Sequence, residues 1–224
     1  FIDIYHGMKE QIFSALNQTP AVITLRHGQL IQAVFADQFS GEEFQESAVA
    51  AACRIRDAVT DFDPNGMNDP AFKPSIGIAR GEVLTGIITV GDMSEYSITG
   101  KAESMSRLLA QEPQRMKESI LLGDKAGGLV STARPIDYYH TPGFNVVYKL
   151  YGLRPETGEQ DEEFDRTYCR GLDLMYHENN LTVAVQAFTR CLDIKPDDHI
   201  AQLMIDRCSA KTGVISIRGY RALG

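Results

Sequence analysis

Apolar positions along the first 153 residues follow two different periods. They recur every three or four residues in segments 1–17, 44–62 and 102–110, which predicts amphipathic helices there. Short extended runs, which predict strands, lie at 21–26, 30–35, 75–78, 82–90, 96–99, 119–122 and 145–151. The order of these elements predicts an α/β (α+β) domain with hairpins and not a regular βαβ repeat.

Polar residues mark several borders between these elements. The tripeptide His27-Gly28-Gln29 separates the first two extended runs and predicts a hairpin turn. The segment Ser40-Gly-Glu-Glu43 matches a capping box and predicts the start of the second helix. Residues 61–66 match the first half of a calcium loop, but Pro64 interrupts it and Phe72 occupies the position of the bidentate Glu. We therefore predict a polar loop, not a calcium site.

The composition changes after Leu153. Residues 154–165 contain six acidic side chains, which predicts a solvated linker. Helical periodicity returns at 164–176, 181–192 and 199–211 and predicts a small all-α part. We place the domain boundary here, with one domain over 1–153 and an acidic linker followed by helices over 154–224.

Charge and motif content narrow the function classes. The chain has 22 basic and 30 acidic residues, hence a formal net charge of −8, and it shows no basic stripe, so we expect no nucleic-acid partner. No apolar run approaches the roughly 20 residues that span a bilayer, which predicts a soluble, cytoplasmic protein. Walker, nucleophile-elbow and His-Glu-x-x-His motifs are missing from the sequence. The four cysteines lack close spacing and predict reduced thiols.

One group of motifs resembles a known family. Ile76-Gly-Ile-Ala-Arg-Gly-Glu-Val-Leu-Thr-Gly86 is followed by Glu95-Tyr-Ser-Ile-Thr-Gly100 and Arg107-Leu108, and Ala33-Val34-Phe35 precedes them. In order and spacing, these segments resemble the catalytic domain of class III adenylate and guanylate cyclases. The resemblance implies a ferredoxin-like, cyclase-type sandwich over residues 1–153, a head-to-tail dimer, and conversion of ATP or GTP to a cyclic nucleotide with Mg or Mn.

Several family positions are substituted in this chain. The resemblance puts the first metal-binding Asp on a strand before residue 1, so we expect that strand to be absent and Asp3 to lie on a solvated helix face. Gln29 replaces the second metal-binding Asp, and a neutral amide cannot offset the charge of a divalent cation. The base-reading Lys falls on Leu25, whereas its partner falls on Ser97, which can still hydrogen-bond a base edge. We therefore assign no metal ligand.

The helix after Gly100 carries the remaining candidates. If a one-residue gap lies directly after Gly100, Glu103 and Arg107 fall on the family's Asn and Arg positions, four residues apart on one helix face. Arg107 is then the candidate catalytic residue, and Gln29, Ser97 and Glu103 are candidate nucleotide-binding residues. A carboxylate at Glu103 repels a polyphosphate and can pair with Arg107, so a plain surface ion pair is the alternative.

The C-terminal helices have a resemblance of their own. Their pattern is similar to one tetratricopeptide repeat and comprises Gly171, Leu172, Tyr176, Ala184, Phe188, Cys191 and Pro196. A generic helical hairpin is the alternative. Because a single repeat cannot close its own core, we expect it to dock on the first domain. The residues expected to cap it are Ile200, Met204, Ile205 and Cys208.

These observations leave three hypotheses for function. In the first, a catalytically impaired cyclase-like domain signals by dimerisation, nucleotide sensing or partner binding through the helical tail. In the second, the chain is an active cyclase in a homodimer, or in a heterodimer whose other chain supplies the metal-binding aspartates. In the third, it is a tetratricopeptide-type scaffold. Related domains often belong to larger membrane-associated proteins, so we expect either a free cytoplasmic protein or the cytoplasmic part of such a protein.

Overall fold

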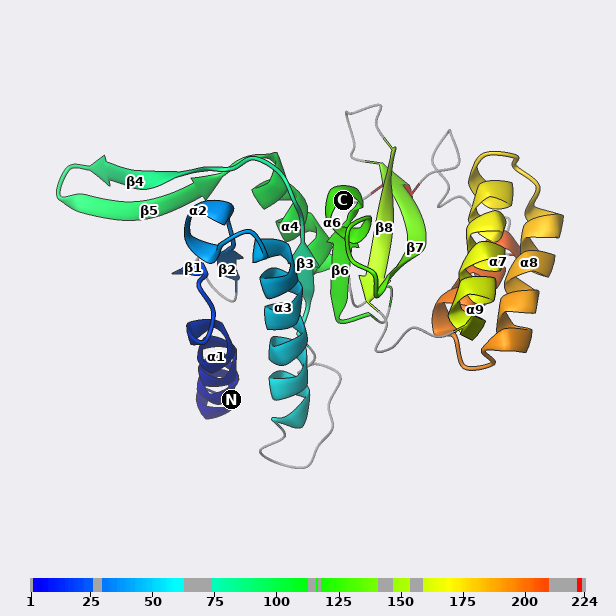
Figure 1. The fold of residues 1–224 in the computed structure, drawn as a ribbon, viewed down its shortest axis with the longest axis horizontal. Helices are drawn as coiled ribbons and strands as arrows, with labels where there is room; N and C mark the ends of the chain where they lie inside the picture. The colour runs from blue at the N-terminus through cyan, green and yellow to red at the C-terminus, as the bar shows by residue number, and fades with distance from the viewer. Residues whose placement is uncertain are drawn as a thin grey trace.

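The computed structural model describes residues 2–25, 30–62, 74–112, 116, 118–140, 147–153, 159–209 and 221–222 (Figure 1). The N-terminal part contains the predicted helices and hairpin. Its elements are α1 (Ile2–Asn17), β1 (Val22–Leu25), β2 (Ile31–Val34), the short helix α2 (Asp37–Ser40) and α3 (Phe44–Asp61). Strands β1 and β2 pair antiparallel, with Thr24 opposite Gln32.

A five-stranded sheet in the order β3-β6-β8-β7-β9 forms the centre of the fold. Its strands are β3 (Ile76–Ile78), β6 (Ile120–Gly123), β8 (Val147–Leu153), β7 (Ala133–His140) and β9 (Arg221–Ala222). The β3–β6 and β7–β9 pairs are parallel, whereas β8 pairs antiparallel with both neighbours. The apolar pattern does not predict β7, because Arg134, Pro135 and Asp137 interrupt it, and the pairing of β7 with β8 has a register shift between Pro135 and Asp137.

Both faces of this sheet are covered. Along β6, Ile120 and Leu122 belong to a cluster that includes Ala52 of α3, whereas Leu121 belongs to a second cluster with Leu109 of α4 (Lys101–Gln111). The short helix α6 (Asp124–Gly127) also packs in the first cluster. Successive strand residues point to opposite faces, so a strand buried on both sides reads as a continuous apolar run. The predicted mixed α/β sandwich is confirmed.

Helix α4 lies unusually close to β3. A Cβ on Gly77 would come within 2.1 Å of the Ser106 carbonyl oxygen and 2.5 Å of the Ala110 nitrogen. Only glycine permits this approach, because the clashing atoms belong to the helix backbone and cannot rotate away. The position of α4 against the sheet is therefore fixed by its backbone.

Two local predictions need correction. The capping box is wrong, because the N-cap of α3 is Glu43, without a side-chain cap bond, and Ser40 instead ends α2. The Ser40 hydroxyl donates a hydrogen bond to the Pro20 carbonyl at 3.0 Å. This bond connects the end of α2 to the turn that follows α1. The strand predicted at 96–99 begins earlier: β5 (Met93–Thr99) pairs along its whole length with β4 (Leu84–Val90). Figure 1 shows this hairpin extending away from the body.

Three C-terminal helices follow, as predicted: α7 (Glu159–Tyr176), α8 (Leu181–Ile194) and α9 (His199–Ser209). The predicted linker is wrong from Glu159 onward, where the acidic segment is helical, and residues 154–158 lie outside the described residues. Phe164 is fully buried, and Asp161 is buried beside Lys195, with which it forms an ion pair. Phe164 and Tyr168 lie one helical turn apart and are both buried in the core, so the acidic start of α7 is amphipathic.

The predicted docking of this tail on the first domain is confirmed. Buried residues of α9, namely Ile200, Met204 and Cys208, share one cluster with Leu109 and Leu121 of the first domain, and Ile205 packs against it. Figure 1 shows the three helices beside β7.

A buried polar network joins the tail to β7. The Asp137 carboxylate, 1% exposed, accepts hydrogen bonds from the Tyr176 hydroxyl at 2.6 Å and from Arg207 Nη1 at 2.7 Å. Arg134 pairs with Asp198 at the start of α9, and the Asp198 carboxylate also accepts from the Ala201 N–H at 2.8 Å. Removing one partner of such a buried pair typically costs about 3–5 kcal/mol, so these pairs fix the tail in one orientation.

Three predictions concern other parts of the chain. Residues 63–70 of the polar loop and Phe72 lie outside the described residues. All four cysteines are free, with Cys191 and Cys208 buried and Cys53 and Cys169 half-buried. Across the part of the chain that the structure describes, no helix combines the length and apolar character needed to cross a membrane.

Glu118 lies where the helical tail meets β7, between Arg134 of β7 and His199 of α9. Its carboxylate is 3.9 Å from Arg134 and 3.8 Å from His199, and the side chain is only 17% exposed. Burial raises the pKa of Glu118 to about 7; Arg134 opposes this shift and Asp198 adds to it. Between the ordinary glutamate pKa and pH 7, the folded chain holds a proton that the unfolded chain releases. Stability contributed by this group is therefore lost as the pH rises through 7.

We predict that the free energy of unfolding falls by on the order of 2 kcal/mol between pH 5 and pH 8 because of Glu118, and that Glu118→Gln removes this part of the slope. Urea denaturation at several pH values measures both slopes. Glu162→Gln, an exposed site on α7, is the matched control and should leave the slope unchanged. Identical slopes for the wild type and Glu118→Gln would contradict the prediction.

Candidate functional site

Helix α4, which packs closely on β3, carries two of the candidate residues, Glu103 and Arg107. It begins directly after β5 at Gly100, where φ is 148° and a Cβ would approach the Glu82 carbonyl oxygen to 2.8 Å. A residue with a side chain is strained in this conformation, so glycine permits the abrupt change from strand to helix. Glu103 and Arg107 then lie one turn apart on the same helix face.

The Glu103 carboxylate is the centre of a small polar cluster. Its Oε1 accepts a hydrogen bond from Gln32 Nε2 at 2.9 Å and lies 3.8 Å from Arg107 Nε. Its Oε2 accepts from the Ser104 hydroxyl at 3.2 Å. The Glu103 side chain is 14% exposed, whereas Arg107 is 52% exposed. The ion pair that the four-residue spacing predicts is therefore present, and only its cationic member faces solvent.

Gln32, from β2, was missed by the sequence reasoning. It lies opposite Thr24 of β1, whose hydroxyl is 3.5 Å from Gln32 Oε1. An ionised carboxylate accepts hydrogen bonds only, so the amide nitrogen of Gln32 must face Glu103. The available signal was a polar residue inside the short apolar strand Ile31-Gln-Ala-Val34; its partner, 71 residues away, was not foreseeable.

Ser97, the third candidate within the described residues, does not join this cluster. Ser97 lies half-buried on β5, opposite Gly86, and no hydrogen bond links it to Glu103 or Arg107 within the described residues. Gln29 and the side chains of Leu25 and Asp3 lie outside the described residues. Of the four candidates, the structure brings together Glu103 and Arg107.

The donor atoms around Glu103 are poorly suited to Mg or Mn. These ions prefer carboxylate oxygens in an octahedral shell, and two-metal sites need several of them. The cluster supplies one carboxylate, already engaged by an amide and a guanidinium. Within the described ranges, no group of three or more His, Cys, Asp or Glu side chains is placed to hold a metal ion. The described residues do not fit a two-metal centre.

Arg107 has the chemistry of a phosphate-binding residue, because an exposed guanidinium can donate two parallel hydrogen bonds to an anion. The neighbouring Glu103 carboxylate cancels its charge and would repel the same anion. The cluster as described carries one cation and one anion, so its field favours weak, not tight, polyphosphate binding.

Solved structures with a similar fold are known, whereas comparisons of the sequence with family models and curated proteins find no match. Among solved structures, the adenylyl cyclase CyaB from P. aeruginosa is similar, with a TM-score of 0.55 and 18% identity over 70% of this chain and 85% of that chain. A structure of a bacterial light-regulated adenylyl cyclase gives a TM-score of 0.54 at 12% identity, over 70% of this chain and 45% of that chain.

A second structure of a bacterial light-regulated adenylyl cyclase gives a TM-score of 0.53 at 12% identity and covers 92% of this chain. This chain spans about half the length of the two light-regulated cyclase chains, since 45% and 50% of them are covered. At these identities the similarity establishes a cyclase-like fold.

We predict that Glu103→Gln strengthens binding of a nucleoside triphosphate to this site. The amide keeps a hydrogen-bonding group toward Gln32 but removes the negative charge beside Arg107. A gain on the order of 1 kcal/mol corresponds to about fivefold tighter binding. Titration of fluorescently labelled ATP and GTP measures it. Glu46→Gln, an exposed change on α3, should have no effect. Unchanged or weaker affinity in Glu103→Gln would contradict the prediction.

Proposed function

We propose that this chain is a signalling module built on the class III cyclase fold, with impaired catalysis, and that it acts by dimerisation, nucleotide sensing or partner binding. The observation that carries this proposal is the Glu103 cluster. Arg107, the candidate catalytic residue, is paired with a carboxylate at the position where the family has a neutral side chain. Its surroundings fit nucleotide sensing better than rapid turnover.

The chemistry of cyclisation explains why this matters. The 3′-hydroxyl must lose a proton, and negative charge on the transferring phosphoryl group must be stabilised, which metal ions and cations normally do. A carboxylate beside the single cation opposes that stabilisation. The substitution of Gln29 at a metal-binding position, inferred from the resemblance, acts in the same direction.

An active cyclase is the second candidate, and two observations favour it. The fold is similar to that of adenylyl cyclases, and the Arg107 side chain is half exposed, so a substrate held between two chains would reach it. In this case the chain works as a homodimer, or in a heterodimer whose other chain supplies the missing carboxylates. ATP and GTP both remain candidate substrates.

The β4–β5 hairpin is the proposed dimer contact. On one face of it, Leu84, Ile88, Val90 and Met93 are 76%, 55%, 72% and 77% exposed. Cross-strand pairing places Val90 opposite Met93 on that face, whereas Ile88 lies opposite Glu95. The apolar side chains therefore form a stripe that Gly86 interrupts and that Glu95 borders. A two-stranded ribbon alone is marginally stable in water, and such a stripe is typical of a buried interface. We propose a second cyclase-like domain as the covering partner.

The helical tail is proposed as a second unit, over residues 154–224, that binds a protein partner. The tetratricopeptide-like spacing of α7 and α8 motivates this role. Free cysteines agree with a reducing compartment such as the cytoplasm.

We predict no cyclic nucleotide formation above background from the purified chain with ATP or GTP, in Mn or in Mg. Product analysis by chromatography over several hours measures it, with Arg107→Ala as the comparison. This side chain is half exposed, so its removal should leave the fold intact. Turnover that Arg107→Ala abolishes would contradict impaired catalysis and establish the second candidate.

We predict that the chain dimerises and that Ile88→Glu raises the dissociation constant at least about tenfold, because a charge would be buried in the apolar stripe. Sedimentation velocity over a concentration series measures this. Thr89→Glu adds the same charge on the opposite face of the hairpin and should have little effect. A wild-type monomer at high concentration, or an unaffected Ile88→Glu dimer, would contradict the prediction.

A further inference from the structure

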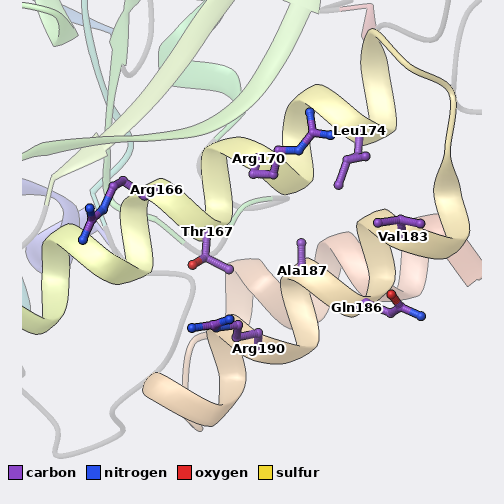
Figure 2. Close-up of a pocket in the computed structure, with 8 residues that line it drawn as sticks. All are labelled: Arg166, Thr167, Arg170, Leu174, Val183, Gln186, Ala187 and Arg190. Carbon is purple, nitrogen blue, oxygen red and sulfur yellow. The ribbon is translucent and has the colours of Figure 1, made fainter.

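The α7–α8 pair has a hollow along its surface that the cyclase-like body does not use. Figure 2 shows side chains of both helices lining it. The apolar part of the lining comes from Leu174 of α7 and from Val183 and Ala187 of α8. Leu174 is 3% exposed and belongs to the main core, whereas Val183 is 39% exposed. The apolar floor of the hollow therefore includes Leu174, which is buried in the core, and its edge includes Val183, which is exposed to solvent.

Three arginines line the same hollow: Arg166 and Arg170 from α7 and Arg190 from α8. Figure 2 shows them on the two helices that border the space. This placement is unusual in a chain with 22 basic residues, 30 acidic residues and a net charge of −8. The hollow thus combines an apolar floor with a local concentration of positive charge.

Two of these arginines have solvent-exposed carboxylate partners. Arg190 pairs with Glu163 at 2.8 Å with side chains 66% and 51% exposed, and Arg170 pairs with both carboxylate oxygens of Glu178 with side chains 56% and 45% exposed. Solvent-exposed ion pairs contribute about 0–1 kcal/mol, so a carboxylate from outside replaces Glu163 at little cost, whereas Glu178, held by two contacts, is replaced at a greater cost. An arginine also offers a bidentate fork that suits a carboxylate.

We infer that the α7–α8 hollow binds an acidic protein segment in which a large apolar side chain is flanked by carboxylates. The apolar side chain lies on the Leu174–Ala187 floor, and the carboxylates pair with Arg170 and Arg190. This inference rests on the proposed function, because it specifies the chemistry of the partner of the helical tail. A protein segment fits better than an anionic membrane, since the site is a hollow between two helices that a single chain segment can enter and a flat lipid surface cannot.

The test begins with the full chain and a display library of random 12-residue peptides. We expect selected peptides to be rich in Asp and Glu around one Leu, Ile or Phe. The best of them, labelled for fluorescence anisotropy, should bind more weakly as salt rises, because exposed charges are screened.

Two variants test the location. Arg170→Gln/Arg190→Gln removes the charges, and Val183→Asp removes the apolar contact while adding a negative charge. Val183 is in the first turn of α8, three residues after the N-cap Asn180, where an acidic side chain favours the helix dipole, so this variant should fold. Each should weaken peptide binding at least about tenfold. Arg54→Gln, an exposed arginine of α3, is the control and should bind like the wild type.

The contrary outcomes are distinct. Selected peptides that are neutral or basic, no selected peptide, or binding unchanged in both variants would overturn the inference. Binding to vesicles with 30% anionic lipid, by the wild type and not by the variants, would overturn it in favour of a membrane surface. Loss of the dimer in Val183→Asp would show instead that a second copy occupies the hollow. Dimerisation and nucleotide titration of the same variants report separately on the proposed function.

Discussion

The buried Asp137 carboxylate is the constraint on which the arrangement of the whole chain depends. A carboxylate that is 1% exposed is tolerated only when its oxygens are fully paired. Its partners, Tyr176 and Arg207, come from α7 and α9, at opposite ends of the helical tail. The strand β7 cannot be buried as observed unless both helices are in place. The tail is therefore joined to β7 through buried polar contacts.

The same core connects the two places where we propose function. Leu109 of α4 and Phe188 of α8 are both fully buried in one cluster. Helix α4 is in turn fixed against β3 by the close approach at Gly77, so Glu103 and Arg107 occupy a defined position relative to the sheet. A cyclase-like body with a rigidly attached helical tail is a suitable design for a module that combines nucleotide sensing with partner binding.

Sequence patterns predicted the elements whose periodicity is strong and failed where polar or special residues interrupt it. Helices α1, α3, α4, α8 and α9 were predicted close to their observed bounds because their apolar spacing is regular. Strand β7 was missed because Arg134, Pro135 and Asp137 break its alternation, although Arg134 and Asp137 are buried and pair with Asp198 and Arg207, respectively. The Glu103–Arg107 pair followed from helical spacing, whereas the contact of Glu103 with Gln32 did not, because it joins residues 71 positions apart.

The sequence by itself determined the fold class, the mostly local elements and the ion pair on α4, since these depend on spacing within a single segment. It also determined that the tail must dock, because a single helical repeat cannot bury its own apolar face. Only the tertiary structure decided how it docks and which buried charges it pairs with. Only the structure placed three arginines around one apolar hollow, since Arg166 and Arg190 lie on different helices. Such long-range pairings depend on packing that no local pattern encodes.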